Sequence, residues 1–150
     1  MLSIKKAAIK PTWFDWGDGF EVQVQDIGQQ KRDYLVEKNK RKDETDWTKF
    51  GKELVMLSVT GWKGLTNRIL LQVCKAIELD PSANLDEEIE FSQENLKDLI
   101  ENASPTFNAF LIKSIGKLPE VHNQLVAQEL ENLSHASGIK IAPKGLTTDN

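Results

Sequence analysis

The chain has 150 residues, 39% hydrophobic content, a formal net charge of −4 and an isoelectric point near 5.3. This length suits one domain with a real core, and the mild acidity argues against a nucleic-acid partner, which needs a concentrated basic face. No apolar run approaches the ~20 residues that span a bilayer, and the N-terminus lacks the apolar region of a secretory signal. The single cysteine, Cys74, allows no internal disulfide. This cysteine content indicates a reducing, intracellular environment.

Residues 11–25 carry the signals of a β-hairpin. Trp13-Phe14-Asp15-Trp16 is rich in aromatic residues, and Phe20 to Gln25 alternates strictly between apolar and polar side chains. The intervening Gly17-Asp18-Gly19 contains the Asp-Gly pair that tight hairpin turns favour, because such turns need a positive φ. We therefore predict a hairpin with a half-buried second strand.

Two helices are predicted after the hairpin. Residues 29–42 are polar with a narrow apolar stripe, and their charged end, 38–46, is expected to be a solvated helix end and linker. Residues 47–60 carry apolar side chains at helical spacing over a wide arc, which places this helix at the centre of the core, with Asp46 as its N-cap. Gly61 and Gly64 bracket Trp62-Lys63 and predict a tight turn.

The remaining elements are also predicted to be helical. Thr66 and Ser92 are placed to cap helices at 67–79 and after 92, and Phe91 can pack on Leu96 as a hydrophobic staple. Ser104-Pro105 begins another helix, which Gly116 ends. Pro119 opens a last helix that stops before Gly138.

We therefore predict a predominantly α, α+β fold, in which the N-terminal β-hairpin packs on a bundle of about five helices. It forms one globular domain over residues 1–138, with helices between about 29 and 137 and a mobile C-terminal tail at 139–150. The predicted core residues are Phe50, Leu54, Leu57, Trp62, Phe91, Leu96, Phe107 and Phe110, and Trp47 and Cys74 are also expected inside.

No residue pattern indicates catalysis or a metal site. His122 and His135 lie thirteen residues apart without cysteine or carboxylate partners at ligand spacing, so both are expected on a helix surface. Residues 15–19 lack the later carboxylate of a calcium loop, and the chain has no phosphate-binding glycine loop or nucleophile elbow. We expect no enzyme activity and no cofactor, with the acids at 87–90 solvated.

Two groups of apolar residues are candidates for a partner surface. A small hairpin cannot bury both of its faces, so Trp13, Phe14 and Trp16 are candidates for self-association or partner binding. The apolar residues of the last helix spread over more than one narrow stripe and form the second candidate surface: Val121, Leu125, Val126, Leu130 and Leu133.

Two motifs stand out in the middle of the chain. The first is Val59-Thr60-Gly61-Trp62-Lys63-Gly64-Leu65-Thr66, and the second is Ile89-Glu90-Phe91-Ser92-Gln93-Glu94-Asn95-Leu96 with Leu99-Ile100. In this order, with the hairpin strand and polar helix before them and Pro105 with an aromatic-rich helix after them, they resemble the tail assembly chaperones of long-tailed, non-contractile bacteriophages. The resemblance spans residues 20–115. The predicted helix 67–79 departs from it, because such proteins often have a short loop there.

The resemblance implies a mostly helical protein that binds the tape measure protein and keeps it soluble before the tail tube polymerises. It implies action in the cytoplasm of an infected or lysogenic bacterium, self-association and absence from the finished virion. Such proteins are often made in two forms by ribosomal frameshifting, of which the longer recruits the tail tube protein. Two alternatives stay open: a minor structural tail protein, and an adaptor or regulatory binding protein from a prophage.

Overall fold

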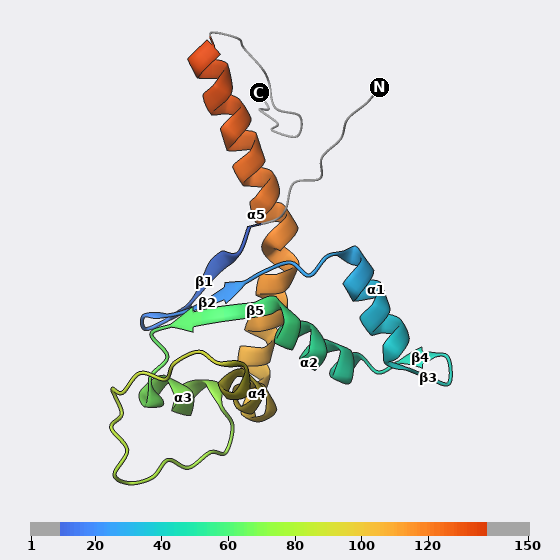
Figure 1. The fold of residues 1–150 in the computed structure, drawn as a ribbon. Coiled ribbons are helices and arrows are strands. Elements are labelled where there is room, and N and C mark those ends of the chain that lie inside the picture. The colour runs from blue at the N-terminus through green and yellow to red at the C-terminus, as the bar shows by residue number, and fades with distance from the viewer. Residues whose placement is uncertain (1–9, 138–150) are drawn as a thin grey trace.

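The computed structural model describes residues 10–137, with side chains described as far as residue 133. This part of the chain forms a three-stranded antiparallel sheet, a separate two-stranded hairpin and five helices (Figure 1). The order of the large sheet is β1-β2-β5, with β1 at Thr12–Gly17, β2 at Phe20–Val24 and β5 at Val59–Lys63. The predicted helix-rich α+β class is confirmed. The predicted tail, 139–150, lies outside the described residues.

The N-terminal hairpin forms as predicted. Asp18 and Gly19 connect its strands with φ angles of 53° and 82°, the positive values of a tight hairpin turn that follows the strand twist. Phe14 lies opposite Val22 in the register, and a bulge separates Asp15 from Gly17. The apolar side chains of β2 are buried, so the alternation in the sequence does mark the face that packs on the core.

The segment predicted as a tight turn after residue 60 is strand β5, and that prediction is wrong. Trp62 pairs with Val22 and Gly61 with Gln23. β2 would otherwise present an unpaired edge, and a third strand satisfies its main-chain groups. The turn comes later, at Gly64, where φ is 77° and a Cβ atom would collide with the carbonyl oxygen of Gly19. Glycine is therefore required at that position.

Two helices and a small hairpin lie between β2 and β5: α1 at Gln29–Lys38, β3 at Lys40–Arg41, β4 at Glu44–Thr45 and α2 at Trp47–Ser58. The predicted linker is thus a hairpin, whose turn residues Lys42 and Asp43 have φ angles of 49° and 68°. Asp46 caps α2 as predicted, because its side chain accepts a hydrogen bond from the Lys49 amide at 3.1 Å. α1 buries only Leu35.

The other three helices are α3 at Asn67–Val73, α4 at Gln93–Asn102 and α5 at Pro105–Ser137. α3 is shorter than the predicted 67–79, because the chain leaves the helix to form a β-bridge between Cys74 and Ala103. The Lys75 amide donates to the Asn102 carbonyl oxygen at 2.9 Å. Ser92 caps α4 as predicted, with its hydroxyl accepting from the Asn95 amide.

α5 is one continuous helix, so the predicted break at Gly116 and Pro119 is wrong. Leu111, Ile115 and Leu118 are buried at helical spacing across that point. Proline costs a helix one hydrogen bond and introduces steric strain, about 3 kcal/mol, and burial of a leucine or isoleucine returns about 2 kcal/mol for each side chain. The packed stripe therefore keeps the helix continuous.

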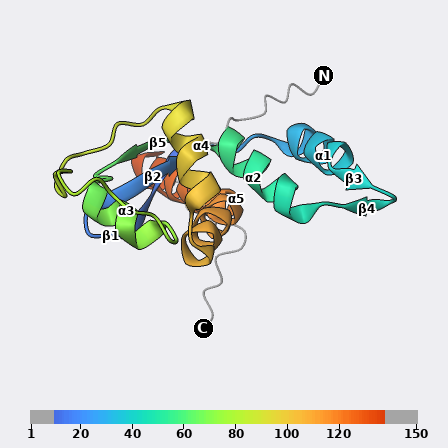
Figure 2. The same cartoon turned by 90° about the horizontal axis from the view of Figure 1, so that it is seen from below.

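The core lies between the large sheet and the first half of α5. Phe20 stacks on Phe107 with ring centroids 5.8 Å apart, and Val22, Val24, Leu96 and Leu99 are buried around them. The second half of α5 projects away from the other elements (Figure 1). Seen from below, α1 with β3 and β4 lies at one end of the molecule, and α3 with the loop before α4 lies at the other (Figure 2).

Most of the predicted core residues lie in or against this core. Leu54, Trp62, Leu96 and Phe107 are buried, and Phe50, Phe91 and Phe110 are partly buried and pack on the cluster. The prediction for Leu57 is wrong, because its side chain is 48% exposed. α2 buries the face of Leu54, Val55 and Ser58, and Leu57 points to a different side. The expectation that Trp47 is inside is also wrong, because it is exposed at the end of α2 that extends beyond the sheet.

Candidate partner-binding surfaces

The aromatic residues of the hairpin do not form the predicted common surface. Trp16 packs edge-on against Phe107 and Phe110, with both centroid distances 5.2 Å, and Phe14 packs against the same core. Trp13 is exposed, and the Lys63 ammonium lies 4.5 Å from its ring centroid. The alternation of a strand puts Trp13 on the face opposite Phe14 and Trp16, and α5 covers the latter face. The prediction is therefore corrected for Phe14 and Trp16.

The second half of α5 is the second predicted surface, and there the structure leaves apolar residues exposed. Leu125 is 47% exposed and Leu130 is 40% exposed, and Val126 and Leu133 are also exposed. Val121, nearer the body of the protein, is half-buried. At 100° per residue these positions cover about half of the helix circumference. This segment therefore presents a broad apolar face on a projecting helix (Figure 1).

A groove between α1 and α2 was not predicted from the sequence. Its volume is about 360 Å³, and it is lined by Lys31, Tyr34, Leu35, Lys38, Glu53, Met56 and Leu57. Tyr34 is 64% exposed, and the Lys38 ammonium lies 3.4 Å from the Glu53 carboxylate. One signal was present in the sequence: Tyr34, Leu35 and Val36 are consecutive, so one face of a helix cannot bury all three.

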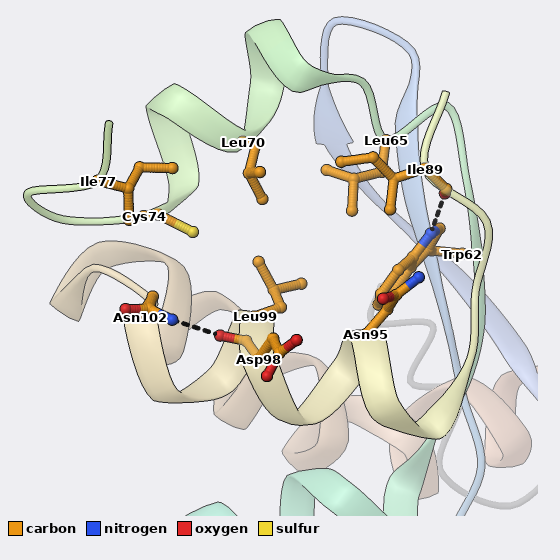
Figure 3. A pocket seen from close by; sticks show the side chains of 10 residues that line it. All are labelled: Trp62, Leu65, Leu70, Cys74, Ile77, Ile89, Asn95, Asp98, Leu99 and Asn102. Atoms are coloured by element: carbon orange, nitrogen blue, oxygen red, sulfur yellow. Dashed lines mark hydrogen bonds between the residues drawn. The ribbon is translucent and has the colours of Figure 1, made fainter. Parts of the chain in front are cut away.

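A pocket of about 230 Å³ lies between α3, the loop before α4 and α4 (Figure 3), and we call it the α3–α4 pocket. Its lining residues are Trp62, Leu65, Leu70, Cys74, Ile77, Ile89, Asn95, Asp98, Leu99 and Asn102. The Trp62 indole Nε1 donates a hydrogen bond to the Ile89 carbonyl oxygen at 2.8 Å. Burial raises the pKa of the Cys74 thiol, which favours the protonated form and a packing role.

Within 10–137, no group of three histidine, cysteine, aspartate or glutamate side chains has the geometry to hold a metal ion. His122 is half-buried on α5, and the side chain of His135 lies outside the described part. Hydrogen bonds from the amide and hydroxyl of Ser82 lower the pKa of Asp80, which belongs to an exposed turn. No helix among these residues is long and apolar enough to cross a membrane.

No family model, curated protein or solved structure matches this chain. The two motifs behind the resemblance nevertheless lie together in the fold. Trp62 of the first packs edge-on against Phe91 of the second, with ring centroids 4.9 Å apart, and the hydrogen bond from Trp62 to Ile89 joins the same segments. The motifs therefore form one structural unit, which brings β5 and the start of α4 together.

Proposed function

We propose that this chain is a tail assembly chaperone of a long-tailed, non-contractile bacteriophage, which binds the tape measure protein and keeps it soluble before the tail tube polymerises. Two features support the proposal. The motifs that resemble this family occur in the family's order along the chain, and Trp62 of the first motif contacts Ile89 and Phe91 of the second. The protein would act in the bacterial cytoplasm and be absent from the virion.

The observation that carries the binding role is the exposed apolar face on the second half of α5. Leu125, Val126 and Leu130 are exposed together on a helix that projects from the folded body. Apolar groups at helical spacing can pack against an amphipathic helix of a partner, and an exposed apolar patch on a folded protein commonly marks such a site. A long tape measure protein with amphipathic helices offers this kind of partner.

The test is co-expression of this chain with the tape measure protein of the same phage. The wild-type chain should hold the tape measure protein in the soluble fraction and co-purify with it. The double variant Leu125→Ser/Leu130→Ser should lose most of this effect, because partial burial of each leucine against a partner contributes about 1–2 kcal/mol.

The matched control is Gln124→Ser/Gln128→Ser, which places the same new residues on the same helix but keeps the leucines. It should retain binding. Equal binding by both double variants would show that the apolar face of α5 does not bind the tape measure protein. Detection of the protein in purified virions would contradict the chaperone proposal and indicate a minor structural tail protein.

A further inference from the structure

The α3–α4 pocket has the size of one large side chain. Its volume, about 230 Å³, exceeds the ~150 Å³ of an apolar cavity that accepts benzene and is smaller than the ~300–1,000 Å³ of pockets for drug-sized ligands. Figure 3 shows Leu65, Leu70 and Ile89 facing Leu99 across the opening. These walls suit a leucine, methionine or phenylalanine side chain.

One wall of the pocket offers hydrogen-bond acceptors. Asn95, Asp98 and Asn102 follow one another along α4 (Figure 3). The amide nitrogens of Asn95 and Asn102 donate to the carbonyl oxygens of Glu90 and Asp98, each at 2.9 Å. Within the described part of the chain, the Asp98 carboxylate has neither a hydrogen-bond donor nor an ion-pair partner. Lysine and arginine side chains carry donors only, so they complement this wall.

The surroundings of the pocket are strongly acidic. Residues 76–102 contain nine acidic side chains and one lysine, a net charge of −8 against −4 for the whole chain. Asp86 is neutralised by Arg68 at 3.2 Å, and no other acid of this segment forms an ion pair with a described residue. No group of three ligands among the described residues has metal-binding geometry. The negative field therefore complements an organic cation better than a bound metal ion.

We propose that the α3–α4 pocket docks a short cationic amphipathic segment of a partner protein, whose one apolar side chain enters the pocket while its lysines or arginines contact Asp98 and the neighbouring acids. The α1–α2 groove lies at the opposite end of the molecule and carries Lys31 and Lys38 at its rim. Glu53 also lines that groove and pairs with Lys38, so its net charge is slightly positive, and the charge distribution favours the α3–α4 pocket for such a segment. This site is separate from the apolar face of α5 and does not depend on the proposed chaperone function.

The test uses the full chain and a synthetic helical peptide with lysines and one leucine at helical spacing. Fluorescence anisotropy should show binding that weakens as salt is raised. Nuclear magnetic resonance should show shifts of the Trp62 indole N–H and of the Asn95 and Asn102 side-chain amides. Peptides with glutamate for lysine, or serine for the leucine, should not bind.

Asp98→Asn keeps the shape of an exposed side chain and should weaken peptide binding about fivefold, because a charge-assisted hydrogen bond is lost. Asp43→Asn, at the turn of the β3–β4 hairpin, removes the same charge far from the pocket and should leave affinity unchanged. Circular dichroism should show both variants folded. The proposal is wrong if the lysine peptide does not bind, or if the two variants change its affinity equally. It is also wrong if the nuclear magnetic resonance shifts caused by the peptide lie in α1, α2 or α5 instead.

Discussion

Trp62 joins β5 to the segment that leads into α4. It is only 8% exposed, packs edge-on against Phe91 and donates its indole hydrogen bond to the Ile89 carbonyl oxygen. The sequence predicted its burial from its place beside the most apolar helix, and the same argument was wrong for Trp47 at the other end of that helix. The sequence could not predict its role as a strand residue, since that depends on pairing with Val22, forty residues earlier.

We expect Trp62→Ala to lower the free energy of unfolding by about 3–5 kcal/mol, as truncation of large buried aromatic residues does. Trp62→Phe should cost less, because it keeps most of the ring contact with Phe91 and loses the hydrogen bond, worth about 1 kcal/mol. Urea unfolding followed by circular dichroism measures both. A near-zero effect of the alanine variant, or equal effects of the two, would contradict this account of Trp62.

At the scale of elements, the helix caps could be predicted from the sequence, whereas the local signals for breaks and turns at Gly61, Gly116 and Pro119 were overridden by tertiary packing. Asp46, Thr66 and Ser92 each accept the capping hydrogen bond expected of them, because a cap needs only residues three positions apart. The continuity of α5 through Pro119 depends on the packing of Leu118 against elements distant in sequence. The formation of β5 likewise depends on its pairing with β2. Of the candidate surfaces, the apolar face of α5 could be predicted from helical spacing in the sequence. The α1–α2 groove and the α3–α4 pocket could not.

Two glycines allow the same substitution to be tested in opposite contexts. Gly64 follows β5, has φ at 77° and leaves no room for a Cβ atom, whereas Gly116 lies in α5 with open space around it. Gly64→Ala should therefore lower the free energy of unfolding by at least about 1 kcal/mol, because the backbone at residue 64 must shift away from Gly19. Gly116→Ala should stabilise it by about 0.5–1 kcal/mol, because alanine favours the helix.

Thermal or urea unfolding of the two variants should give changes of opposite sign. Destabilisation by Gly116→Ala would indicate that α5 is not a regular helix at this point. Unchanged stability in Gly64→Ala would mean that the turn after β5 does not require a positive φ.

For the whole molecule, the two halves of α5 have different surroundings. Phe107, Leu111 and Leu118 in the first half are buried against the sheet and the other helices. Leu125 and Leu130 in the second half are exposed, and Pro119 lies at the junction without an amide hydrogen to continue the helical ladder. Helix stability in proteins comes mainly from packing of one face, so the second half should open more easily than the first.

Hydrogen exchange followed by mass spectrometry should therefore show rapid exchange over residues 121–132 and strong protection over 107–118. When a partner helix packs on the exposed leucines, exchange over 121–132 should slow, while the first half, already protected, should change little. The matched control Gln124→Ser/Gln128→Ser should show the same slowing of exchange, and Leu125→Ser/Leu130→Ser should not. Uniform protection along α5 in the free protein would mean that the second half is held by other contacts, and its apolar face would then no longer be available to a partner.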